Sequence, residues 1–146
     1  MEFRIARYDD LDRDTLYDIL ALRSAVFVEE QGCAYRDVDG RDRHAYHMTC
    51  TDGGRLVGYL RILDRGETFN EMSIGRVVVT ERKKGIGTEM VRRALDFITE
   101  DLHEDTVRIE SQTYTAEMYE RLGFVRVGDE FLEDGIPHVQ MLFNKE

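Results

Sequence analysis

VVVTERKKGIGT, residues 77–88, passes from an apolar strand through a basic turn with two glycines into a helix. A helix start offers backbone N–H groups without internal partners and the positive end of the helix dipole. A pyrophosphate can accept hydrogen bonds there, because Gly85 and Gly87 carry no side chain that would hold a ligand off the backbone. The basic residues before the helix add positive charge. By itself, the stretch fits a pyrophosphate site and a basic turn that opens a surface helix equally well.

Apolar periodicity predicts the elements around this stretch. A helix over Gly85–Asp101 carries one apolar stripe with amphipathic spacing. The helical pattern over Asp12–Gln31 fits one helix or two, because β-branched residues weaken its second half. A short helix is predicted over Ala116–Leu122, and strands are predicted at Phe3–Tyr8, His44–Thr51, Arg55–Leu63, Met72–Thr80, Val107–Ile109, Phe124–Phe131 and Val139–Phe143. This order predicts an α/β (α+β) fold with a mixed sheet of about six to seven strands and helices on its faces.

Composition narrows the class of protein. The 146 residues show no linker and no repeat, so we expect a single domain over residues 1–146. The net charge of −10 argues against a general nucleic-acid binder, which needs cations for phosphate contacts. No apolar run approaches the roughly 20 residues of a membrane span, and the N-terminus lacks a signal-peptide core, which predicts a cytoplasmic protein without membrane contact. Cys33 and Cys50 lack metal-site spacing, and we expect reduced thiols rather than a disulfide, and no metal.

Two motifs in order resemble those of one superfamily. Arg82–Gly87, in the pattern Arg-x-x-Gly-x-Gly after a valine-rich strand, resembles the pyrophosphate motif of the GNAT N-acyltransferases. Ala116–Phe124, AEMYERLGF, resembles the later signature of that superfamily, one helix and one strand further on. The chain is similar to the ElaA-like branch over nearly its whole length after residue 15, with matching stretches at Leu22–Gln31, Arg43-His44, Ile74–Val77 and Glu133–His138.

The resemblance implies a splayed sheet with acetyl-CoA lying in the V between two central strands. It implies direct attack of a primary amine on the thioester in a ternary complex, without a covalent enzyme intermediate. Gln112 stands where many members carry a coenzyme-binding asparagine. The coenzyme residues that the resemblance implies are Val77, Val78, Val79, Arg82, Lys83, Lys84, Gly85, Ile86, Gly87, Thr88, Gln112 and Tyr119.

The resemblance also suggests catalytic roles. Tyr119 matches the tyrosine that protonates the leaving thiolate, although an aromatic side chain on a helix also packs against a sheet. Backbone N–H groups near Val78 and Val79 would polarise the thioester carbonyl. Glu71, at the start of the central strand, is the candidate base, and the alternatives left open are Glu110, His44, His47, His138 and a water chain.

The acceptor pocket and the competing functions stay open. The turn before His138 is first of all a hairpin, and the branch resemblance places it beside Phe27, Glu30 and Gln31 at the acceptor pocket. Glu30 is a candidate to hold the ammonium group, or else a capping or salt-bridge residue. The acceptor is a small-molecule or peptide amine of unspecified identity, and a homodimer is possible. A non-catalytic acyl-CoA sensor of the same fold is the alternative, and an acyl-homoserine-lactone synthase is a minor one.

Overall fold

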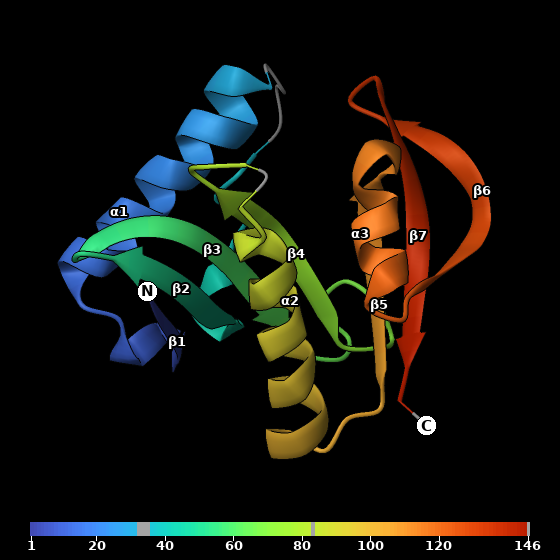
Figure 1. The fold of residues 1–146 in the computed structure, drawn as a ribbon, viewed down its shortest axis with the longest axis horizontal. Coiled ribbons are helices and arrows are strands. Elements are labelled where there is room, and N and C mark those ends of the chain that lie inside the picture. Colours follow the sequence, from blue (N-terminus) through green and yellow to red (C-terminus); the bar gives the residue numbers. More distant parts are fainter. Residues whose placement is uncertain (32–35, 83, 146) are drawn as a thin grey trace.

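The computed structural model describes residues 1–31, 36–82 and 84–145. Seven strands form two antiparallel sheets (Figure 1). The first sheet has the order β1-β2-β3-β4, with β1 at Glu2–Arg7, β2 at Tyr46–Asp52, β3 at Arg55–Leu63 and β4 at Ser73–Val79. The second has the order β5-β7-β6, with β5 at Thr106–Gln112, β6 at Val125–Glu133 and β7 at Ile136–Asn144.

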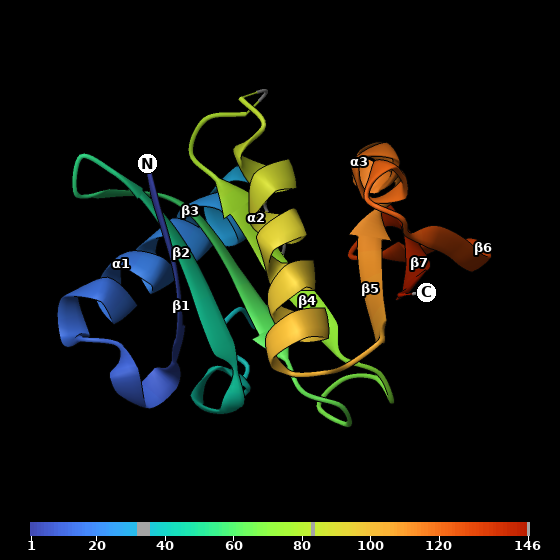
Figure 2. The same ribbon diagram turned by 60° about the horizontal axis from the view of Figure 1, so that its bottom comes forward.

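The two sheets meet at the start of β4 and β5. Met72 and Val107 form a parallel bridge, and the amide of Arg108 donates to the Met72 carbonyl at 2.9 Å. Beyond this point β4 and β5 diverge into a V (Figures 1 and 2). The prediction of a mixed, splayed sheet in an α+β fold is therefore confirmed.

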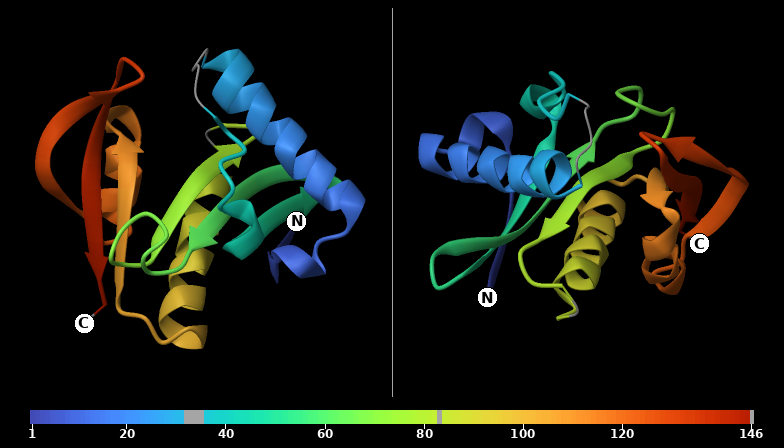
Figure 3. Two further views of the ribbon diagram at one scale, coloured as in Figure 1. Left: turned by 180° about the vertical axis from the view of Figure 1, so that it is seen from behind. Right: turned by 90° about the horizontal axis from the view of Figure 1, so that it is seen from above.

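Helices cover both faces of the first sheet. The helix α1 at Arg13–Arg23 continues directly into a π-helical segment at Ser24–Glu30. The helical pattern over Asp12–Gln31, which fitted one helix or two, therefore forms one continuous helical stretch. Asp12 caps it, because its Oδ1 accepts from the Thr15 amide at 2.7 Å. The helix α2 at Ile86–Asp96, with a π-helical continuation to Asp101, lies on the opposite face (Figure 3). The third helix, α3 at Ala116–Arg121, lies beside the second sheet.

Two predicted strand ends need correction. Tyr8 and His44 lie in short 3-10 turns at Tyr8–Asp10 and Asp42–His44. Each turn is closed by a hydrogen bond between residues three apart, which extended strand backbone cannot form. The amide of Leu11 donates to Tyr8, and that of Ala45 donates to Asp42. The remaining predicted strands occur where expected, and β5 and β7 extend further than the apolar residues indicated.

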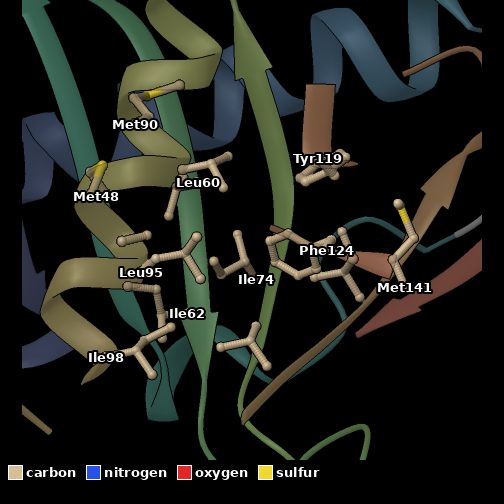
Figure 4. Packing of buried hydrophobic residues seen from close by; sticks show 14 of the residues in the cluster. Met48, Leu60, Ile62, Ile74, Met90, Leu95, Ile98, Tyr119, Phe124 and Met141 are labelled. Atoms are coloured by element: carbon tan, nitrogen blue, oxygen red, sulfur yellow. The ribbon is translucent and has the colours of Figure 1, made fainter. Parts of the chain in front are cut away.

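The main core fills the space between the first sheet, α2 and the second sheet (Figure 4). The predicted apolar stripe of α2 is confirmed, since Met90, Val91, Ala94 and Ile98 are completely buried. A smaller cluster on the α1 face contains Ile19, Tyr59 and Val78, among others. Apolar burial thus fixes both helices to the sheet.

A buried ion cluster adds to this packing on the α1 face. Arg23, at the end of α1, is completely buried. Its Nη1 donates to Asp42 Oδ1 at 2.7 Å, its Nε donates to Asp37 Oδ2 at 3.1 Å, and its Nη2 donates to the Asp37 carbonyl at 2.8 Å. Both aspartates are themselves nearly buried. The guanidinium therefore ties α1 to the segment at residues 37–42.

Two further arginines join this cluster to the sheet. Arg61 on β3 donates from Nη2 to Asp39 Oδ2 at 2.6 Å and from Nη1 to Asp42 Oδ1 at 3.0 Å. Arg76 on β4 donates from Nε to Asp37 Oδ1 at 2.9 Å. Burial alone would raise the pKa of Asp39, but the hydrogen bonds from the Arg61 side chain and the Arg41 amide, with the positive charges of Arg61 and Arg76, together outweigh burial and hold that pKa well below its usual range. Asp39 is therefore ionised, and its bonds to Arg61 are charge-assisted hydrogen bonds.

Replacing Arg23 with methionine should destabilise the fold strongly. The change leaves Asp37 and Asp42 buried without their main cation, which costs about 3–5 kcal/mol of the free energy of unfolding. Urea denaturation followed by circular dichroism measures it. Arg13→Met, at the exposed start of the same helix, is the matched control and should change stability by less than about 0.5 kcal/mol. Equal stability of the two variants would contradict the role given to the cluster.

Candidate active site

The diverging strands enclose a cavity of about 790 Å³. Its lining comes from β4, β5, the π-helical end of α1, the start of α2, α3 and the turn between β6 and β7. This volume lies in the range of small-molecule and cofactor sites. All the predicted coenzyme residues that the structure describes line it, namely Val77, Val78, Val79, Arg82, Lys84, Gly85, Ile86, Gly87, Thr88, Gln112 and Tyr119. Lys83 lies outside the described residues.

A β-bulge shapes the wall formed by β4. Tyr59 pairs with Val78 and Arg61 pairs with Gly75, so two β4 residues stand opposite the single residue Leu60. One of the two, Arg76, has φ 51°, a left-handed conformation unusual for a residue other than glycine. A bulge disrupts the regular ladder and bends the strand. It therefore turns β4 away from β5 at the level where the cavity opens.

Beyond the bulge, β4 offers an open backbone edge to the cavity. The amide of Thr80 donates to the Val57 carbonyl of β3 at 2.9 Å. Because successive residues of a strand direct their backbone groups to opposite edges, the N–H and C=O of Val79 point toward the V. An extended amide-containing chain, such as the pantetheine arm of coenzyme A, can add to such an edge as a further strand does.

The start of α2 lies at the end of that edge. Gly85 is the N-cap residue with φ 75°, and Gly87 lies in the first turn. A Cβ atom on Gly87 would meet only Met118 Sδ and Val79 Cγ1, each at 3.9 Å. The backbone of this turn is therefore accessible from the cavity, as an anion site at a helix start requires.

The basic residues of the turn hold exposed partners. Arg82 pairs with Glu30, and the Nζ of Lys84 lies 2.6 Å from Glu81 Oε2. The hydrogen bond that Lys84 donates to Glu81 raises the pKa of Lys84. All four side chains are about half exposed or more. Ion pairs exposed in this way contribute little, so an anionic ligand can displace the carboxylates.

Tyr119, on α3, also lines the cavity. The side chain is 8% exposed, and its ring meets Phe124 edge-on with centroids 5.6 Å apart. Burial raises the pKa of Tyr119, with a smaller contribution from Tyr114. Both interpretations from the sequence thus apply, because the ring is part of the core and also lines the cavity. The phenol is protonated at neutral pH.

Of the predicted acceptor residues, the structure brings three to the cavity. Phe27, Gln31 and His138 line it, and Gln112 Nε2 donates to Gln31 Oε1 at 3.4 Å. Glu30 does not line the cavity and instead pairs with Arg82. Glu30 therefore lies in a salt bridge, which the sequence analysis gave as the alternative to holding the ammonium group.

The candidate bases separate into two groups. Glu71 accepts from Arg108 Nε at 3.1 Å and from Nη2 at 3.2 Å, which lowers the pKa of Glu71, and it lines a separate shallow pocket. His44 is exposed beside Glu67, and His47 is buried between the Tyr59 hydroxyl and the Asp42 carbonyl. Only Glu110 and His138, among the bases considered, line the main cavity.

Glu110 has the electrostatic properties of a base. Although it keeps contact with solvent, partial desolvation raises its pKa, and the nearby carboxylate of Glu133 raises it further. Gln140 Nε2 donates to Glu110 Oε1 at 3.4 Å and holds the carboxyl in place. His138 is fixed as well, with Nδ1 2.7 Å from the Ile136 carbonyl.

Sequence reasoning did not identify three cavity residues, Arg41, Arg61 and Arg76. They belong to the ion cluster, in which Arg61 and Arg76 have partners distant in the sequence and Arg41 pairs with Asp39 two residues away. The described ranges contain no group of three His, Cys, Asp or Glu side chains suited to a metal ion. They also contain no helix long and apolar enough to cross a membrane. Cys50 is a buried free thiol, and Cys33 lies outside the described residues.

Comparison with known proteins agrees with this geometry. Residues 22–145 match the acetyltransferase (GNAT) domain family. A UPF0039 protein of Schizosaccharomyces pombe is 40% identical over 97% of this chain and 95% of that protein, and ElaA of Escherichia coli K12 is 34% identical over the same shares. The chain therefore belongs to the GNAT acetyltransferase family and is similar to ElaA within it.

Two solved structures share the whole fold. An acyl-CoA N-acyltransferase from Pseudomonas aeruginosa superposes with a TM-score of 0.91 at 35% identity, covering 98% of this chain and 99% of that one. The crystal structure of Escherichia coli ElaA gives a TM-score of 0.91 at 33% identity, with the same coverage. The family and these neighbours imply acyl-CoA binding.

Substitutions at Gly87 should separate stability from coenzyme binding. Gly87→Ala meets only ordinary contacts and improves helix propensity, so the free protein should keep its stability or gain up to about 1 kcal/mol. Gly87→Glu should raise the dissociation constant of acetyl-CoA more than about tenfold, because it places an anion at the pyrophosphate position. Calorimetric titration measures both variants. Leu132→Glu adds the same charge on an exposed strand residue and should bind as wild type does. Unchanged binding in Gly87→Glu would place the pyrophosphate elsewhere.

Proposed function

We propose that this protein transfers an acetyl group from acetyl-CoA to a primary amine, by direct attack in a ternary complex. One observation carries the proposal. A single cavity connects the glycine-containing start of α2, the open edge of β4 and the phenol of Tyr119. These are the positions at which a pyrophosphate, a pantetheine arm and a thioester sulfur would lie in order along the coenzyme.

The binding roles follow from that order. Backbone N–H groups at Gly85–Thr88 would hold the pyrophosphate, with Arg82 and Lys84 neutralising its charge. The edge of β4 at Val77–Val79 would pair with the amides of the pantetheine arm. Gln112, opposite at the end of β5, would contact the arm from the second sheet. The bulge on β4 leaves amide groups near the thioester carbonyl, where negative charge develops.

The chemistry requires one base and one acid. The acceptor ammonium, with a pKa of about 10.4 for a lysine-like amine, must lose a proton before its nitrogen attacks the thioester carbon. Glu110 would take that proton, directly or through a water molecule. The C–N bond forms, the tetrahedral intermediate collapses and the C–S bond breaks. The thiolate then takes a proton from the Tyr119 hydroxyl, which its raised pKa keeps protonated until that step.

Tyr119→Phe should lower kcat about a hundredfold and leave the dissociation constant of acetyl-CoA unchanged, because only proton donation is lost. A thiol-release assay with acetyl-CoA and a panel of amines measures the rate. The control is Tyr17→Phe, which changes an exposed tyrosine on α1. Binding of acetyl-CoA without thiol release for any amine would instead support an acyl-CoA sensor. Full activity in Tyr119→Phe would exclude the phenol as the acid.

The pH dependence of the rate should identify the base. Glu110 must be deprotonated to accept a proton, so kcat should fall as the pH drops through its pKa, which lies above the ordinary glutamate value. Glu110→Gln should remove this acid limb and lower kcat at neutral pH by about a hundredfold. Glu71→Gln should keep the limb, because Glu71 is paired with Arg108 outside the cavity. The reverse result would assign the base to Glu71.

A further inference from the structure

The two walls of the cavity carry opposite charges. The wall from the second sheet is acidic, and the wall from the first sheet is basic. Away from the start of α2, the acidic side chains are Glu110, Glu133 and Asp134, with His138 among them, and the basic ones are Arg61 and Arg76 of the first sheet and Arg41 of the segment before β2. The remaining charged lining residues are Glu81, Arg82 and Lys84 at the turn before α2 and Arg121 on α3. A ligand that crosses the V therefore meets carboxylates on one side and guanidinium groups on the other.

The register of the strands places these charges at a similar height in the V. Met72 and Val107 form the bridge from which β4 and β5 leave in parallel. Glu110 lies three residues past Val107, and Arg76 lies four residues past Met72 on a strand shortened by its bulge. At about 3.3 Å per residue, both lie roughly 10 Å above the bridge. The acidic and basic groups thus face the same level of the cavity.

The basic wall carries a net positive charge. Its ion cluster contains the arginines Arg23, Arg41, Arg61 and Arg76 and the aspartates Asp37, Asp39 and Asp42, which gives +4 − 3 = +1. The surplus lies at a partly buried site, where solvent screens charge less than at the surface. An anionic group in the cavity would balance it.

Arg61 indicates which kind of anionic group would balance this positive charge. It is 3% exposed, and its Nη1 and Nη2 atoms are bonded to Asp39 and Asp42. Its Nε is the one buried side-chain nitrogen or oxygen without a hydrogen-bond partner among the described residues. Native proteins rarely leave such a donor unpaired, and Arg61 lines the cavity. Because Asp39 and Asp42 occupy both Nη atoms, a ligand could accept only from Nε, and a carboxylate oxygen is an anionic acceptor for that donor.

We infer that the acceptor is a zwitterion, an amino acid or an amino-acid derivative with a primary amine and a carboxylate. Its ammonium group faces Glu110 and Glu133, and its carboxylate faces Arg61 and Arg41. The inference rests on the proposed function and names the substrate class of the same cavity. It also disfavours polyamines and aminoglycosides, because their additional ammonium groups would meet the basic wall.

The test compares acceptors that differ only in the carboxylate. Initial rates of thiol release from acetyl-CoA are measured with the L-amino acids, with their α-amides and with spermidine. At least one amino acid should exceed its own amide in kcat/KM by about ten- to hundredfold, the range expected for hydrogen bonds to a charged group. The amide has the less basic amine, so amine basicity works against this outcome. Spermidine should be a poor acceptor.

Arg41→Gln tests the basic wall without removing a buried residue. Arg41 is 40% exposed on its side chain and lines the cavity. The variant should raise KM for the preferred amino acid several-fold, leave kcat nearly unchanged and leave the kinetics of the amide unaffected. Arg43→Gln removes the same charge two residues away at an exposed position that does not line the cavity. It should behave as wild type does.

The outcomes separate this inference from the proposed function. Equal or faster turnover of the amides or of spermidine would overturn the zwitterion and retain the acyltransferase. If no acceptor releases thiol, calorimetric titration of amino acids and amides into the CoA-saturated protein provides the measurement. Tighter binding of an amino acid than of its amide, weakened in Arg41→Gln, supports the inference even then. Equal or absent binding overturns it.

Discussion

The buried guanidinium of Arg23 is the interaction on which the site depends. A cation without access to water requires full compensation, and Asp37 and Asp42 can supply it only if residues 37–42 fold back against α1. Those aspartates in turn fix Arg61 and Arg76 on neighbouring strands. Arg76 keeps a left-handed backbone that a side chain ordinarily avoids, and its ion pairs with Asp37 stabilise that conformation. The bulge on β4, and with it the open edge facing the cavity, therefore depends on the ion network centred on Arg23.

The second sheet is positioned by a different force. It meets the first sheet through the bridge between Met72 and Val107, and apolar side chains from both sheets pack together in the main core. Figure 4 shows Phe124, which directly precedes β6, between Ile74 of β4 and Met141 of β7. Side chains fill the base of the V, and the space above it stays open. The division into a packed base and an open top gives a rigid cavity, because interiors of this density resist deformation.

Local patterns in the sequence predicted most of the elements and pointed to coenzyme residues that line the cavity wherever the structure describes them. The stripe of α2 and the glycines at its start are set by neighbours within one or two turns, so they can be recognised without the fold. The ion cluster could not be predicted in this way. Arg23, Asp37, Arg61 and Arg76 come from four separate segments, and a polar stretch such as residues 37–42 ordinarily indicates an exposed loop. Only the fold shows that its aspartates are buried.

The sequence also did not reveal which of the two glutamates considered as bases, Glu71 or Glu110, lines the cavity. Glu71 precedes the bridge residue Met72, and Arg108 follows the bridge residue Val107. Two side chains beside a point where strands touch are close enough to pair, and Glu71 and Arg108 do so. Glu110 lies farther along β5, where the strands have separated and the space between them is a cavity. The distance of a residue from the point of divergence therefore decides whether its carboxylate becomes a structural partner or lines the cavity. That distance is a property of the strand register between the two sheets, which no motif within either strand encodes.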